Sequence, residues 1–165
     1  MIDRTLVIDA NVLLGAVLGR RVSDLLERFA LTATFLAPDT AFEEADEHLA
    51  AVLHKRRAPP TALQPALDKL VALRAVVRPM ERVEYESMRD AALARIGQRD
   101  PDDWPVLACA LTAGCPIWTE DRDFFGTGVA TWTSASVEIF LAEVLQQGGG
   151  RRHSSGYVPG FQEGP

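Results

Sequence analysis

Short apolar segments rich in β-branched residues alternate with amphipathic helical patterns along most of this chain. The first segment, Thr5–Ile8, predicts a buried strand that Asp9 ends. Further short strands are predicted over residues 34–36, 75–77, 116–119 and 129–132. Because strands that alternate with helices usually pair in parallel, with the helices covering both faces, this pattern predicts an α/β fold.

The segments between these strands predict helices with an apolar stripe. The predicted helices cover residues 12–18, 21–31, 38–54, 63–71, 81–96, 102–113 and 134–145. Asn11 is expected to cap the first helix, and Pro38 and Pro79 are expected to lie beyond the strands that precede them. In the helix over 81–96, the residues expected to face inward are Val83, Met88, Ala92 and Ile96.

The composition favours one globular domain over residues 1–147. Residues 148–165 hold six of the twelve glycines and predict a disordered tail. No apolar run is long enough for a membrane helix, the N-terminus does not resemble a signal peptide, and the two cysteines are too few for a disulfide scaffold. We therefore expect a cytoplasmic protein with no membrane partner.

The acidic residues carry the strongest functional signal. The formal net charge is −6, which argues against binding nucleic acid through a broad basic surface. Asp9 and Asp121 each follow a predicted strand, and Asp103 lies in the first turn of the helix that precedes the fourth strand. That helix must start close to Asp103, because Pro105 has no N–H and fits only the first turn. In a parallel sheet these positions, with Glu43 or Glu44 after the second strand, converge on one edge.

Each acid taken alone fits a structural role as a turn former, a helix-end acid or part of a solvated helix face. Their shared position favours a site. Carboxylate oxygens are the ligands that Mg²⁺ and Mn²⁺ prefer, and one or two such ions can orient a water molecule against a phosphodiester. The acids therefore predict a site for one of these ions.

Four segments also resemble the acidic motifs of the PIN-domain ribonucleases, many of which are toxins of VapC-type toxin–antitoxin pairs. These segments are VIDANVLL (7–14), EEADEHL (43–49), RDPDDWPVLACAL (99–111) and WTEDRDF (118–124). The resemblance implies a three-layer α/β/α sandwich with a five-stranded parallel sheet in the order 3-2-1-4-5. It also implies metal-dependent RNA cleavage, an antitoxin partner and a homodimer.

The resemblance also implies roles for individual residues. Asp9, Asp103 and Asp121 match the metal-binding aspartates, and Glu44 matches the helical glutamate, with Glu43 as the fallback. Asn11 and Thr119 match the small polar and hydroxyl residues beside the first and last aspartates. Asp123 resembles a structural cap of the TEDRDF turn, with metal binding through water as the alternative.

Other enzyme classes fit less well. A receiver domain needs an acid pair after the first strand and an aspartate after the third, but this chain has only Asp9 after the first and Arg78-Pro79 at the end of the third. A haloacid-dehalogenase-like phosphatase needs Asp-x-Asp after the first strand, where this chain has Asp9 and Asn11. The serious alternative is a PIN fold that binds RNA or protein without catalysis. Three tryptophans, Trp104, Trp118 and Trp132, flank the predicted site, where core packing is favoured over base stacking.

Overall fold

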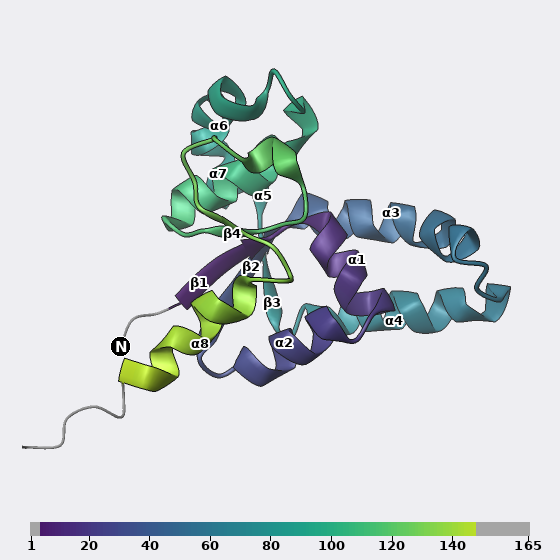
Figure 1. Cartoon of the computed structure of the whole chain (residues 1–165). Helices are drawn as coiled ribbons and strands as arrows, with labels where there is room; N and C mark the ends of the chain where they lie inside the picture. The colour runs from purple at the N-terminus through teal and green to yellow at the C-terminus, as the bar shows by residue number, and fades with distance from the viewer. Residues whose placement is uncertain (1–3, 148–165) are drawn as a thin grey trace, which may run out of the picture.

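The structure is a computed structural model, and it describes residues 4–147. Five parallel strands form one sheet in the order β3-β2-β1-β4-β5, with helices on both faces (Figure 1). The predicted α/β sandwich and its strand order are therefore confirmed. The strands are β1 (Arg4–Ile8), β2 (Ala33–Pro38), β3 (Val77–Met80), β4 (Ile117–Trp118) and β5 (Thr131–Trp132). The predicted tail over 148–165 lies outside the described residues.

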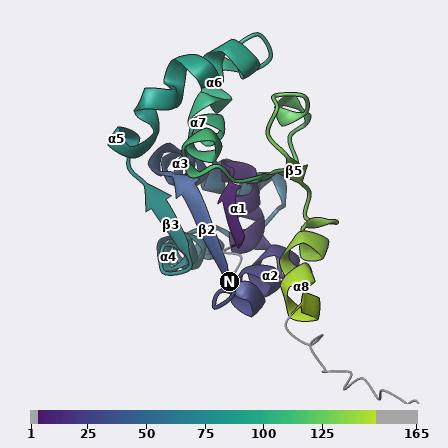
Figure 2. The ribbon, with the colours of Figure 1, turned by 90° about the vertical axis from the view of Figure 1, so that its left-hand side faces the viewer.

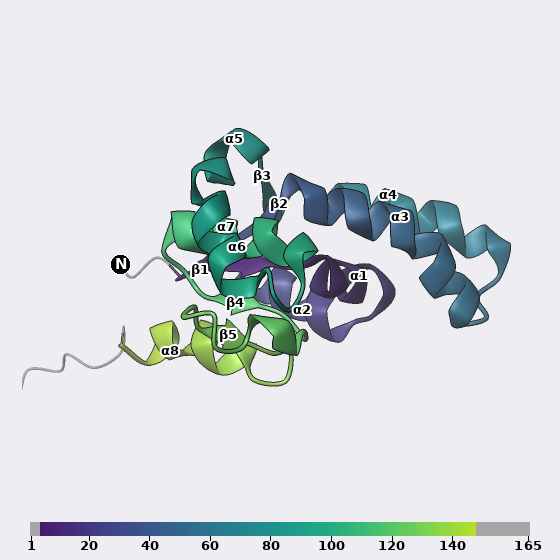
Figure 3. The ribbon, with the colours of Figure 1, turned by 90° about the horizontal axis from the view of Figure 1, so that it is seen from above.

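The helices that connect these strands are of two kinds. The α-helices are α1 (Ala10–Leu18), α2 (Arg21–Phe29), α3 (Asp39–Lys55), α4 (Leu63–Leu73), α5 (Arg82–Tyr85), α6 (Arg89–Ile96), α7 (Trp104–Ala113) and α8 (Val137–Gln147). The 3₁₀ turns are η1 (Pro60–Ala62), η2 (Glu86–Met88), η3 (Pro101–Asp103) and η4 (Arg122–Phe124). Figure 3 shows α3 and α4 as a pair that reaches out from the sheet.

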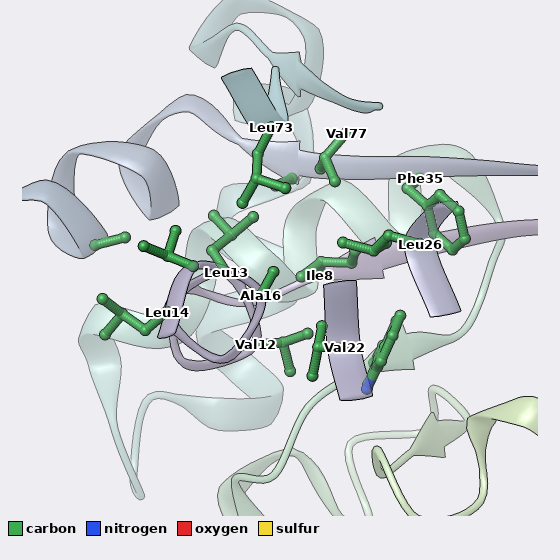
Figure 4. Close-up of a cluster of buried hydrophobic side chains, with 14 of the residues drawn as sticks. Ile8, Val12, Leu13, Leu14, Ala16, Val22, Leu26, Phe35, Leu73 and Val77 are labelled. Carbon is green, nitrogen blue, oxygen red and sulfur yellow. The ribbon is translucent and has the colours of Figure 1, made fainter. Parts of the chain in front are cut away.

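Successive side chains along a strand point to opposite faces of the sheet, so the strands contribute to two separate hydrophobic clusters. Leu6 and Ile8 point to a cluster built with α1, α2, α3, α4 and α8, part of which Figure 4 shows. Val7 points to the other face, where the cluster contains residues of α6 and α7 together with Tyr85. Figure 2 shows α5, α6 and α7 on the opposite side of the sheet from α2. The two clusters fix the sheet between two helical layers.

Three local predictions are wrong. Asn11 is exposed and does not cap α1, because the Asp9 carboxylate accepts the N–H of Val12 instead. Pro38 and Pro79 are strand residues rather than strand stops. Both are tolerated because Pro38 is the last residue of β2 and Pro79 lies in the edge strand β3.

The predicted helix over 81–96 is broken into α5, η2 and α6. Tyr85 is fully buried, and its hydroxyl donates to Asp39 Oδ1 at 2.7 Å, which draws this turn toward the start of α3. Ala92 and Ile96 are buried as predicted. Val83 is 80% exposed and Met88 36% exposed, so their predicted inward orientation is wrong.

Candidate active site

Asp9 lies at the carboxyl end of β1 and caps α1. Its Oδ1 accepts the backbone N–H of Val12 at 2.8 Å, and its Oδ2 accepts the hydroxyl of Thr119. The side chain is almost completely buried. Burial raises the pKa of Asp9 from 3.8 to about 6 and outweighs the two hydrogen bonds, which lower it; repulsion from Asp121 and Glu44 adds to the rise.

The residues after β4 form a turn that holds further carboxylates beside Asp9. The buried Thr119 hydroxyl accepts the backbone N–H of Asp121 at 2.9 Å while it donates to Asp9. Asp121 in turn caps η4, since its Oδ1 accepts the N–H of Asp123 at 2.8 Å. A continuous chain of hydrogen bonds therefore links Asp9, Thr119, Asp121 and Asp123.

Asp103 is the carboxylate whose pKa is raised by the largest number of neighbouring acids. It ends η3 directly before α7, and its Oδ2 is a buried oxygen with no hydrogen-bond partner among residues 4–147. Burial raises the pKa of Asp103 to about 7, with repulsion from Asp100, Asp121, Asp9 and Glu44. The three predicted metal-binding aspartates are thus close enough to repel one another.

Asp100 also belongs to this group, although the sequence did not single it out. Carboxylate oxygens of Asp100, Asp103 and Asp123 all lie within 4.8 Å of one another. Asp100 precedes Pro101, and its Oδ1 accepts the N–H of Asp102 at 2.9 Å. An Asp-Pro pair is a turn signal, and that signal could have placed this side chain at the start of the turn that carries Asp103.

The two glutamates of α3 differ in their relation to these acids. Burial raises the pKa of Glu44, as does repulsion from Asp100 and Asp102, although His48 one turn further along lowers it. Glu44 also contributes to the raised pKa values of Asp9 and Asp103. Glu43, like Glu44, is exposed on this helix. Electrostatic coupling to the aspartates therefore favours Glu44 of the two.

The donor set fits a hard divalent cation. The cluster offers carboxylate oxygens at the carboxyl end of the sheet, beside the β1–β4 pair where the strand order reverses. The unpartnered Asp103 Oδ2 and the mutual repulsion of the acids are both relieved by a positive charge. Oxygen ligands of this kind suit Mg²⁺ or Mn²⁺.

The sequence pattern of the PIN domain matches residues 7–142, so this chain belongs to the PIN-domain family. Among solved structures, it is similar to a chain in the crystal structure of VapBC2 from Rickettsia felis bound to a DNA fragment from their promoter. The TM-score is 0.60 at 10% sequence identity, and the match covers 78% of this chain and 98% of that chain. The two chains share a fold.

No curated protein sequence matches the chain significantly. None of the helices within residues 4–147 combines the length and apolarity needed to cross a membrane.

Proposed function

We propose that this protein is a metal-dependent endoribonuclease that hydrolyses RNA phosphodiesters. The observation that carries the proposal is the environment of Asp103. Its buried Oδ2 has no hydrogen-bond partner within residues 4–147, it lies close to Asp100 and Asp123, and burial and repulsion from four carboxylates raise its pKa. Groups with strongly perturbed pKa values in such a cluster are typical of functional sites. Membership of the PIN-domain family, whose members are generally nucleases, supports the same class of reaction.

In the proposed site Asp9, Asp103 and Asp121 would hold Mg²⁺ or Mn²⁺, and Glu44 would orient the ion or the attacking water. Such an ion, when bound, would supply the positive charge that activates a water molecule and stabilises the leaving oxygen. Asp100 and Asp123 add negative charge and further oxygen donors beside Asp103. Thr119 positions two of the ligands at once, because its hydroxyl bonds both the Asp9 carboxylate and the Asp121 amide.

The test is RNA cleavage by the purified chain with Mn²⁺, with Mg²⁺ and with EDTA. Asp103→Asn and Asp121→Asn keep the shape of the side chain and remove its charge, so each should lower the cleavage rate by roughly 10²–10³. Asp24→Asn, an exposed acid of α2, removes the same charge elsewhere and should leave the rate unchanged. Equal rates for all four proteins would place the activity elsewhere.

We further propose that the protein is the toxin of a toxin–antitoxin pair. The similar VapBC2 structure supports this through its fold, and co-purification with the product of an adjacent small gene would test it. The alternative is a PIN fold that binds RNA or protein without catalysis. Metal-independent RNA binding with no cleavage under any metal would favour that alternative.

A homodimer is also proposed, and its interface cannot rest on the apolar residues of α1 and α2. Most of those side chains are buried in the core, among them Leu13, Leu26 and Phe29. Sedimentation velocity at tens of micromolar should still show a dimer. A monomer alone at that concentration would remove the proposal.

A further inference from the structure

Two arginines lie over a single tryptophan ring next to the acidic cluster. The guanidinium carbon of Arg82 is 5.7 Å from the Trp104 ring centroid, and that of Arg89 is 5.5 Å away. Both distances fall in the range of cation–π attraction. The Trp104 ring also packs against the buried Tyr85 ring, with 5.7 Å between the two ring centroids.

The chain places this group at the same end of the sheet as the carboxylates. Trp104 directly follows Asp103, so their Cα atoms are about 3.8 Å apart. Arg82 begins α5 just after the carboxyl end of β3, and its backbone N–H donates to Asp39 Oδ2 at 3.2 Å. Asp39 itself follows the carboxyl end of β2.

The charge of this region runs against that of the whole chain. Residues 78–99 contain five arginines and four acidic residues, within a chain of net charge −6. Arg82 forms an ion pair with Glu86 at 2.9 Å, whereas Arg89 makes no ion pair with any residue in the described part of the chain. Both arginines are exposed.

Stacking on an aromatic ring orients a guanidinium without using up its hydrogen-bond donors. The ring attracts the flat cation, while N–H groups in its plane stay available to a planar or tetrahedral anion. In Arg82 the exceptions are the Nε and Nη2 groups, which face Glu86. The nearest anions expected at a nuclease site are the phosphates of the substrate strand. A negatively charged site also needs cations beside it to hold a polyanion.

We propose that Arg82 and Arg89, oriented by Trp104, bind the phosphates of single-stranded RNA on the flank of the carboxylate cluster. This proposal rests on the proposed function in its choice of substrate. Arg82 and Arg89 contact the strand, and Trp104 is a positioning residue. The subsite holds the RNA backbone and leaves the chemistry to the carboxylates.

The first measurement is binding of a fluorescein-labelled single-stranded RNA to the full chain in EDTA, where cleavage is suppressed. Neutralising one phosphate contact changes the slope of log affinity against log salt by about 0.7 for single strands. Arg82→Gln and Arg89→Gln should each flatten the slope by that amount and weaken binding roughly eightfold at 50 mM salt. Trp104→Leu should weaken binding in the same direction, and Trp104→Phe should restore it.

The chain offers two matched controls on the opposite face of the sheet (Figures 1 and 2). Arg28 lies 4.7 Å from the Phe29 ring centroid, pairs with Glu138 and is 56% exposed at its side chain, as is Arg82. Arg74 lies 4.4 Å from the Phe42 centroid and matches Arg89. Arg28→Gln and Arg74→Gln should keep the wild-type slope. Equal losses in all four variants, or no RNA binding by the wild type with or without Mn²⁺, would overturn the proposal.

The second measurement is steady-state cleavage with Mn²⁺, which separates this proposal from the proposed function. Arg82→Gln and Arg89→Gln should raise KM and leave kcat close to wild type. Wild-type KM in both variants, with normal cleavage, would overturn the phosphate subsite and leave the nuclease standing. Arginine-dependent binding without any cleavage would overturn the nuclease and leave the subsite standing.

Discussion

At position 9 a single carboxylate serves both a helix and a candidate metal site. One oxygen accepts the N–H of Val12, and the other accepts the hydroxyl of Thr119. A serine or threonine at this position would also cap α1 but would bring no charge. An aspartate is therefore the residue that meets both needs, and its cost is a buried charge with a raised pKa.

That raised pKa makes the stability of the metal-free protein depend on pH. Folded Asp9 holds its proton up to about pH 6, whereas the unfolded chain loses it near pH 4, so folding is favoured at low pH. The contribution is full below about pH 4 and is lost as the pH rises through 6. A pKa difference of this size is worth about 3 kcal/mol.

Urea unfolding in EDTA at pH 4.5 and at pH 8 measures this contribution. The wild type should lose stability between the two values, and Asp9→Asn should lose markedly less. Asp24→Asn should follow the wild type. Parallel pH profiles for wild type and Asp9→Asn would show that the buried carboxyl does not titrate in this window.

The neighbouring glutamates of α3 provide a second test at the residue scale. Repulsion from Glu44 contributes to the raised pKa values of Asp9 and Asp103, and Glu43 is not among the main contributors to either. Glu44→Gln should lower kcat by roughly 10²-fold, as expected when a group that orients the attacking water is removed. Glu43→Gln should keep a kcat close to wild type. The reverse result in RNA cleavage would exchange the two assignments.

At the scale of single elements, the sequence predicted β1, α3 and α7 well because their patterns are local. Apolar spacing and the position of Pro105 place α7 within two residues of its observed start. The segment after β3 was predicted less well because a tertiary contact decides it. The hydrogen bond from Tyr85 to Asp39 spans 46 residues, and no local pattern contains it.

The loop after β4 depends on a similar distant contact. Arg99, just beyond α6, donates to the carbonyl oxygen of Asp123 at 2.7 Å and also to that of Phe125. Arg95 donates to the carbonyl of Thr127 at 3.2 Å. These bonds hold the carboxylate of Asp123 near Asp100 and Asp103.

Removal of the Arg99 contact should loosen this loop without unfolding the protein. We expect Arg99→Gln to lower the free energy of unfolding by about 1 kcal/mol, because a charged donor to two carbonyls is lost from a partly exposed site. Hydrogen exchange should become faster at the amides of residues 123–127. Arg122→Gln, in the same loop and exposed, is the control. Unchanged exchange in Arg99→Gln would show that the loop is held by its own turns.

At the scale of the whole molecule, the strand order brings distant acids together. In the order β3-β2-β1-β4-β5 the chain adds strands on one side of β1 as far as β3 and then continues on the other side with β4. The carboxyl ends of β1 and β4 therefore lie side by side, with residues from the start of α7 next to them. The sequence predicted this convergence because the carboxyl ends of parallel strands share one edge. It did not predict the inclusion of Asp100, since that depends on how the turn before α7 folds over Asp123.

The same convergence predicts how the molecule responds to metal. Asp103 is repelled by Asp100, Asp121, Asp9 and Glu44, so the metal-free fold carries electrostatic strain that a cation removes. An ion that binds only the folded state adds roughly 2.7 kcal/mol at 100 times its dissociation constant. For a chain of this size that raises Tm by about 5–10 °C.

Calorimetric scans at pH 7.5 with EDTA and then with Mn²⁺ or Mg²⁺ test this prediction. The wild type and the control Asp24→Asn should show the full rise in Tm. Asp103→Asn should lose most of it, because this variant removes the charge that Asp100, Asp121, Asp9 and Glu44 all repel. Without metal, Asp103→Asn should be at least as stable as the wild type, since the repulsion is gone and the loss of a helix-end charge costs only about 0.3–1 kcal/mol. A wild-type Tm that ignores both ions, together with a less stable Asp103→Asn, would mean that these acids shape turns and do not bind metal.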